Sequence, residues 1–78
     1  MTVAPLTLLE ASVGTEVWVI MRGEREIRGL LAGYDDYVNL VLENIREYDA
    51  KGQLIDSEPS MLLNGNNIVG ISPGKRSD

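Results

Sequence analysis

Two glycines inside one apolar segment constrain the fold of this chain more than any other feature. Gly29 and Gly33 interrupt residues 26–33. Within that segment, Ile27 and Leu31 lie on one face, as they do in a β-strand. A glycine inside a strand marks a bulge or a sharp bend, because it has no side chain to pack. The segment therefore predicts a sheet that bends strongly on itself.

A short helix is expected before the strands begin. Leu6, Leu9 and Val13 fall on one face at helical spacing over residues 5–13. Gly14 follows, and glycine commonly supplies the left-handed residue that ends a helix. A helix of about two turns has little stability alone, so we expect it to dock on the sheet through this apolar stripe.

Five short strands joined by tight turns follow the helix. They are expected at residues 16–21, 26–33, 38–48, 53–63 and 68–72. Pro59 is expected to interrupt the fourth strand, because proline lacks a ladder donor. The predicted fold is all-β with one short N-terminal α-helix, a five-stranded, strongly bent antiparallel barrel. One domain spans residues 1–74, and residues 75–78 read as a polar tail.

The composition argues against an enzyme. The 78 residues include no cysteine and no histidine, so thiolate metal sites and the commonest general base are missing. Neither phosphate-loop pattern occurs, and the adjacent Asp35 and Asp36 are typical turn residues. We therefore expect no catalysis, metal, cofactor or small-molecule substrate. The longest apolar run, residues 17–21, is far too short for a membrane span, so no membrane partner is expected.

The charge of the chain is unfavourable for non-specific binding to nucleic acid. Seven basic and twelve acidic residues give a net charge of −5, and such a freestanding domain is a poor non-specific binder of RNA. Arg22, Arg25 and Arg28 are expected to form a solvated face. Trp18 is expected to pack under the helix or at a subunit contact.

Two turns nevertheless carry groups that could recognise a nucleotide. Tyr37 offers an aromatic face, and Asn39 and Asn64 offer amides. An aromatic ring on which a base stacks, beside an amide that reads the base edge, is how proteins recognise single-stranded RNA. Hairpin chemistry alone also explains each turn taken singly. One such site binds weakly, whereas several sites in an oligomer gain by effective concentration.

At these residues the chain resembles the Sm and Sm-like family. The first Sm motif corresponds to residues 29–43, which include Gly-Tyr-Asp-Asp-Tyr-Val-Asn, and the second to residues 63–68, Leu-Asn-Gly-Asn-Asn-Ile. The resemblance extends over roughly residues 5–74. In detail the chain is most similar to the fifth subunit type of the eukaryotic Sm-like rings. The family resemblance implies the Sm fold, an SH3-like barrel, and a six- or seven-membered ring in which the fourth and fifth strands, here about residues 57–63 and 67–72, pair with neighbouring Sm-like subunits.

The resemblance also implies a site and a role. Tyr37 would stack on a base, Asn39 would hydrogen-bond its edge, and Asp35 would orient the asparagine. The second loop contributes Asn64, Gly65 and Asn66, with Asn64 in place of the family's usual arginine. The implied function is to bind uridine-rich single-stranded RNA 3′ ends as a subunit of a heteroheptameric ring. The ring would act in pre-mRNA splicing, with the U-six small nuclear RNA, and in mRNA decapping and decay, in nucleus and cytoplasm. Two alternatives are a structural ring spacer with little RNA contact and a self-assembling homomeric ring.

Overall fold

The computed structural model describes residues 5–74. In chain order the elements are helix α1 (Pro5–Ser12), strands β1 (Glu16–Met21), β2 (Arg25–Tyr34), β3 (Leu40–Tyr48) and β4 (Leu54–Leu63), the 3-10 helix η1 (Gly65–Asn67) and strand β5 (Ile68–Pro73). The polar tail expected at residues 75–78 lies outside the described residues, as do residues 1–4.

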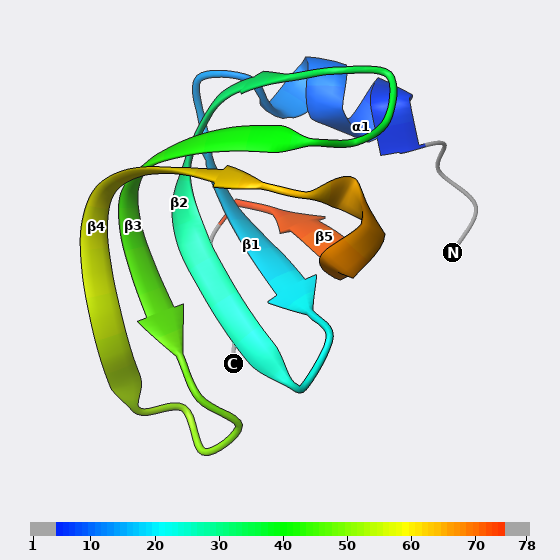
Figure 1. The fold of residues 1–78 in the computed structure, drawn as a ribbon. Helices are drawn as coiled ribbons and strands as arrows, with labels where there is room; N and C mark the ends of the chain where they lie inside the picture. Colours follow the sequence, from blue (N-terminus) through cyan, green and yellow to red (C-terminus); the bar gives the residue numbers. More distant parts are fainter. Residues whose placement is uncertain (1–4, 75–78) are drawn as a thin grey trace.

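The five strands form one antiparallel sheet in the order β4-β3-β2-β1-β5. The sheet curls strongly, with α1 across one end of it (Figure 1). Within the sheet, β4 and β5 are the two outermost strands, and each pairs along one side only. The predicted fold, one N-terminal helix followed by a bent five-stranded antiparallel sheet, is confirmed.

The bend lies at the glycine expected to cause it. Gly29 pairs with Val17 in β1, and the β2–β3 register shifts between Arg28 and Leu30. A Cβ at Gly29 would lie 2.9 Å from the main-chain oxygen of Glu43, so a side chain there would collide with the neighbouring strand. A second shift follows between Leu31 and Gly33. Irregularities of this kind increase the local twist and bend of a sheet.

Proline in β4 behaves differently from our expectation. The strand continues through Pro59, because pairing with β3 continues on both sides of it, at Ile45↔Glu58 and Glu43↔Ser60. Asn44, between these two β3 positions, has a positive φ of 53°. The irregular β3 backbone thus faces the residue that has no N–H to donate, and the strand bends there without ending.

Leu9 anchors the helix in the core. It is fully buried, whereas Leu6 and Val13 are 37% and 46% exposed, so the predicted three-residue stripe is wrong at its two ends. The helix stops at Ser12, and Gly14 has the expected left-handed φ of 87°. Its N–H donates to the Leu31 carbonyl at 2.9 Å. That bond ties the end of the helix to β2, beside the core cluster Leu9, Val17, Val19, Ile27, Leu31, Leu40, Leu42, Ile45 and Leu63.

The other face of β1 carries Trp18, which does not pack under the helix. Val17 and Val19 face the core with Leu9, so strand alternation turns Trp18 to the opposite side. There its ring stacks with Tyr48 at a centroid distance of 5.8 Å, and the Arg28 guanidinium lies 3.7 Å from the ring centroid. The expected solvated arginine face is therefore wrong at Arg28, since cation–π contact holds its guanidinium.

Candidate nucleic-acid interface

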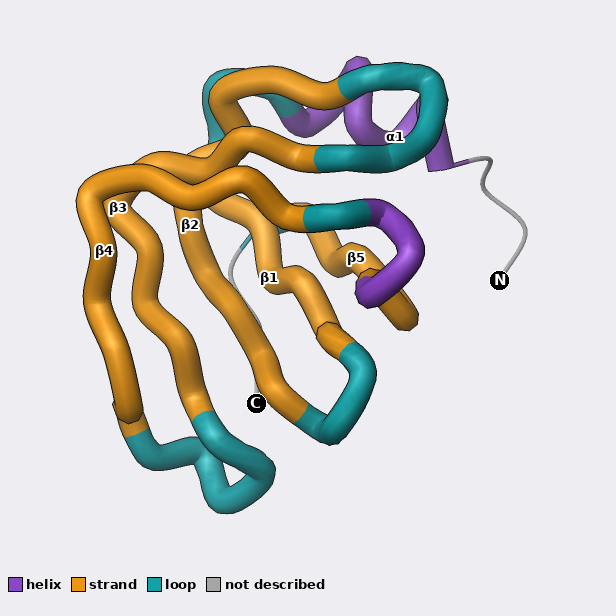
Figure 2. The backbone as a smooth tube through the Cα atoms, in the orientation of Figure 1, coloured by secondary structure: helices purple, strands orange, loops and turns teal. Residues whose placement is uncertain are grey.

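The two loops singled out from the sequence lie against each other. Figure 2 shows the β2–β3 loop and the turn containing η1 on the same side of the sheet. The main-chain N–H of Gly65 donates to Asn39 Oδ1 at 2.8 Å, which joins loops that are far apart in sequence. Strand β3 begins at Leu40 and pairs with the end of β4 at Leu63. This register is what brings Asn39 and Asn64 to the same edge.

Asp35 organises the first loop. Its Oδ1 accepts hydrogen bonds from the main-chain N–H groups of Tyr37 and Asn39, at 2.9 and 3.0 Å. Its Oδ2 accepts from the side-chain amide of Asn39 at 3.0 Å. These bonds, first among them the one from the Asn39 side chain, hold the pKa of the Asp35 carboxyl below its ordinary value of 3.8. The carboxylate therefore orients the Asn39 side chain.

The amide of Asn39 is held at both ends. Nδ2 donates to Asp35 and Oδ1 accepts from Gly65, so the amide has one fixed orientation. An asparagine side chain has two amide hydrogens and two oxygen lone pairs. One of each remains after these bonds. A planar group with an adjacent donor and acceptor is suited to reading the hydrogen-bonding edge of a base.

Tyr37 is the most exposed large apolar side chain among the described residues, at 81% of its surface. Its backbone is held by Asp35, and the next residue, Val38, has a φ of 63°. A positive φ is unfavourable for a β-branched residue, so surrounding contacts must hold this turn in place. The result is an exposed aromatic ring on a loop whose backbone is held by hydrogen bonds to Asp35.

Gly65 forms the contact between the loops. A Cβ on this residue would lie 2.2 Å from the Tyr37 carbonyl oxygen and 2.9 Å from that of Val38. Only glycine permits the two backbones to approach this closely. Gly65 therefore serves the site by letting the two loops pack closely, a role that the sequence motif did not specify.

Asn64 and Asn66 serve the second turn in ways the sequence did not predict. Asn64 Oδ1 accepts from the main-chain N–H of Asn66 at 2.8 Å and caps η1. The amide oxygen of Asn64 thus supports the loop, and its NH2 group and the second lone pair of the oxygen remain for a ligand. The Asn66 carbonyl accepts from Arg22 Nε at 2.9 Å.

Arg22, which was expected on a solvated arginine face, lies beside this site. Its main-chain N–H also donates, to the Asn67 carbonyl at 2.9 Å. Other arginines of the described segment have carboxylate partners: Arg25 pairs with Glu47, and Arg46 with Glu16 at 2.6 Å. Arg22 instead bonds main-chain oxygen and keeps its charge at the second loop. The shared β1–β5 ladder, in which Met21 pairs with Ile68, is the signal that would have placed it there.

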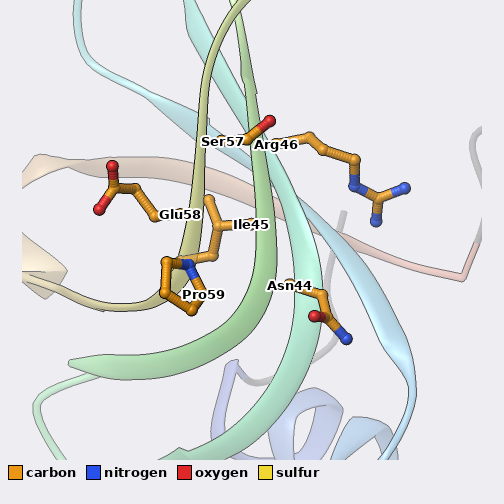
Figure 3. Close-up of a pocket in the computed structure, with 6 residues that line it drawn as sticks. All are labelled: Asn44, Ile45, Arg46, Ser57, Glu58 and Pro59. Carbon is orange, nitrogen blue, oxygen red and sulfur yellow. The ribbon is translucent and has the colours of Figure 1, made fainter.

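Other surfaces of the described chain are less suited to a ligand. A shallow hollow of about 400 Å³ lies on the β3–β4 hairpin (Figure 3). Its charged side chains, Arg46 and Glu58, point away from each other on opposite sides of the hairpin. Residues 5–74 contain no cluster of three or more acidic side chains placed to hold a metal ion. Nor does that segment include a helix of the length and apolarity needed to span a membrane.

Comparison with known proteins agrees with this geometry. The LSM domain family matches residues 7–73. The LSM complex subunit lsm5 of Schizosaccharomyces pombe is 44% identical over 78 residues, covering 100% of this chain and 98% of the relative. The Sm-like protein LSM5 of Arabidopsis thaliana is 44% identical over 72 residues, covering 90% of this chain and 82% of the relative.

Solved structures share the fold. An Sm protein of Pyrococcus abyssi, in complex with a uridine heptamer, superposes with a TM-score of 0.86 at 31% identity, covering 91% of this chain and 99% of that one. A heptameric archaeal Sm protein gives a TM-score of 0.80 at 36% identity, covering 88% of this chain and 98% of that one. With the LSM domain matched over residues 7–73 and the fold shared with solved Sm proteins, this chain belongs to the Sm-like family.

Proposed function

We propose that this protein is a non-catalytic RNA-binding subunit of an Sm-like ring and holds one uridine of single-stranded RNA at the joined loops. The observation that carries this proposal is an exposed aromatic ring, Tyr37, beside an amide of fixed orientation, Asn39. Uracil presents an N–H between two carbonyl oxygens, which matches the remaining acceptor and donor of that amide. Stacking on the ring contributes about 1–3 kcal/mol per base. The uridine heptamer bound by the Pyrococcus Sm protein supports the choice of base.

The two outer strands of the sheet support assembly into a ring. Leu62 on β4 and Val69 on β5 are 71% and 67% exposed. Both strands have a side without a partner in the described sheet, and such edges are favourable sites for pairing with another chain. We therefore propose that residues 57–63 of one subunit pair with residues 67–72 of the next. The heptameric archaeal Sm protein of the same fold supports a ring of this kind.

The charge of the site supports RNA over a purely structural role. Arg22, in the turn after β1, bonds the second loop, so the missing arginine at position 64 does not leave this subunit without a cation there. The net charge of −5 is carried by residues 35–58, which include seven acidic and two basic residues. Much of that segment forms the β3–β4 hairpin, which extends away from the joined loops (Figure 1). A ring also gathers one such site from each subunit, which raises avidity.

The cellular role rests on the relatives. We propose that the ring is heteroheptameric and binds uridine-rich RNA 3′ ends, and the similarity to an LSM complex subunit of fission yeast supports assembly with other Sm-like subunits. We propose that it acts in pre-mRNA splicing with the U-six small nuclear RNA and in mRNA decapping and decay, in nucleus and cytoplasm. The similarity to a heptameric archaeal Sm protein leaves a homomeric ring as the alternative. Native mass spectrometry of the chain alone separates the two, since only a self-assembling chain gives a stable ring mass.

Crosslinking tests the RNA site directly. The assembled ring is irradiated with oligouridine, and the crosslinked residue is identified by peptide mass. A crosslink at Tyr37 is expected, and Tyr37→Ala should lower affinity by roughly five- to 150-fold, the equivalent of one lost stack. Tyr37→Phe is the matched control and should retain affinity. No crosslink in this subunit, together with unchanged affinity for Tyr37→Ala and Asn39→Ala, would show that it is a structural spacer.

A further inference from the structure

The second loop contains an Asn-Gly pair, the sequence in which an asparagine side-chain amide is most readily lost. In an Asn-Gly sequence, the main-chain nitrogen that follows the asparagine attacks the side-chain amide carbon with little steric hindrance, since glycine has no side chain. Asn64–Gly65 is the one Asn-Gly pair of the sequence. The other asparagines precede larger residues: Asn39 precedes Leu40, Asn44 precedes Ile45, Asn66 precedes Asn67 and Asn67 precedes Ile68.

The reaction is a deamidation through a cyclic imide. The Gly65 nitrogen attacks Asn64 Cγ, the new N–Cγ bond forms, the Cγ–Nδ2 bond breaks, and ammonia leaves with the proton of the Gly65 N–H. Water then adds to either imide carbonyl and opens the ring to aspartate or isoaspartate. No oxidant or other reagent is needed.

The fold holds both reacting groups away from this path. The Gly65 N–H donates to Asn39 Oδ1 at 2.8 Å, so the nucleophile is engaged by the other loop. Asn64 Oδ1 accepts from the Asn66 N–H at 2.8 Å, so the side chain under attack is engaged as well. Both hydrogen bonds must break before the ring can close.

The backbone of Asn64 is also in the wrong conformation. Closing the five-membered imide requires Asn64 Cβ and the Gly65 nitrogen to be eclipsed about the Cα–C bond. Asn64 has ψ of 127°, which places that nitrogen near the Cα hydrogen instead. A large rotation is therefore needed, and the contact of Gly65 with the carbonyls of Tyr37 and Val38 opposes it.

We propose that Asn64–Gly65 is a latent deamidation site, and that the hydrogen bond to the Asn39 amide protects it from reaction while the two loops remain joined. Separation of the loops would expose the site to modification. Aspartate at position 64 adds a negative charge to the loop that contacts Tyr37 through Gly65 and Arg22 through Asn66, and isoaspartate lengthens the backbone where Gly65 has no spare room. Either product is expected to weaken RNA binding, a consequence that rests on the proposed function, whereas protection by Asn39 does not.

The test compares rates of modification. The full chain and a synthetic peptide of residues 61–68 are incubated at mildly alkaline pH, and aspartate and isoaspartate at position 64 are quantified by peptide mapping. The peptide is expected to react roughly tenfold faster or more, the factor associated with breaking two hydrogen bonds. Asn39→Ala in the full chain should accelerate the reaction toward the peptide rate. Equal rates in the chain and the peptide would overturn the proposal.

Two controls separate protection by the Asn39–Gly65 hydrogen bond from the general stability of the chain. Ile27→Val lowers the stability of the core without touching the loops, so it should leave the rate at position 64 close to that of the unaltered chain. If Asn39→Ala unfolds, hydrogen exchange of the Gly65 amide in the unaltered chain replaces it. If the Gly65 amide hydrogen exchanges as fast in the chain as in the peptide, the proposed protection by Asn39 is wrong.

A final arm measures the consequence. The deamidated chain is separated and its affinity for oligouridine is compared with that of the unmodified chain. A fall in affinity supports the joined loops as the RNA site. Unchanged affinity would contradict the proposed function, while the protection result stands by itself.

Discussion

Gly65 lies so close to Tyr37 that a Cβ on the glycine would be 2.2 Å from the tyrosine carbonyl oxygen. This contact lets the second loop support the backbone of the residue whose ring is exposed. The exposed ring of Tyr37 therefore depends on a glycine in the turn that follows β4. The conformation of the second loop and the position of the Tyr37 ring therefore depend on the same close contact.

Gly65→Ala should therefore damage stability and RNA binding together. Overpacking against main chain costs about 1–3 kcal/mol, and we expect the free energy of unfolding to fall by that amount in chemical denaturation. Gly33→Ala is the matched control, because a Cβ at Gly33 meets no atom within 4 Å. If Gly65→Ala is as stable as Gly33→Ala, the close contact between the loops is wrong.

Protonation of Asp35 should loosen the first loop at low pH. Hydrogen bonds to the carboxylate lower its folded pKa below 3.8, so its stabilising contribution is present above the unfolded value and is lost as pH falls through the folded value. Carbon-13 NMR of the Asp35 carboxyl should show a titration midpoint below 3.8. In Asn39→Ala the midpoint should rise, because the first cause of the shift is removed. An unchanged midpoint would mean that Asn39 does not hold the carboxylate.

Arg22→Ala should reduce the salt dependence of RNA binding. Each phosphate neutralised on a single strand contributes about −0.7 to the slope of log K against log salt concentration. We expect the slope to become shallower by about 0.7 for each Arg22 that contacts a phosphate. Lys51→Ala is the control, since Lys51 belongs to the β3–β4 turn, at the other end of β3 from the loops. Equal slopes for Arg22→Ala and the unaltered protein would place Arg22 outside the RNA path.

Leu62→Lys should block assembly while leaving the subunit folded. The side chain is already 71% exposed in the single chain, so the substitution costs little folding energy. Burial of a leucine in an interface contributes about 1.5–3 kcal/mol, so each contact should weaken by roughly ten- to 150-fold. Sedimentation velocity measures the loss of the ring. Leu54→Lys, on β4 but outside residues 57–63, should assemble normally; if both variants assemble alike, that edge is not the interface.

Local pattern was sufficient to predict much of this fold. The alternation of apolar residues predicted all five strands, and Gly14 was expected to end the helix, as its φ of 87° confirms. Gly29 was expected at a bend and lies at a register shift. These features depend on neighbours within a few residues, which is why periodicity and turn chemistry reveal them.

Boundaries and partners were harder to predict. Strand β3 begins at Leu40 and not at residue 38, because Asp35 draws Tyr37 and Asn39 into a turn through its carboxylate. Leu6 has helical spacing but is 37% exposed, since the two-turn helix contacts the core mainly through Leu9. The pattern of residues 5–13 cannot predict which of these side chains meets the sheet, because the shape of the sheet is set by other parts of the chain.

The amino-acid sequence by itself determined the strands, the glycine bends and the residue types of the two loops, since each follows from local backbone preference and apolar alternation. Only the tertiary structure decided that the Gly65 N–H would bond the Asn39 amide, and that Arg22 would bond the Asn66 carbonyl. Those contacts depend on strand register, because Met21 meets Ile68 and Leu40 meets Leu63 only after the sheet has curled. Register is a long-range property set by the packing of the whole core.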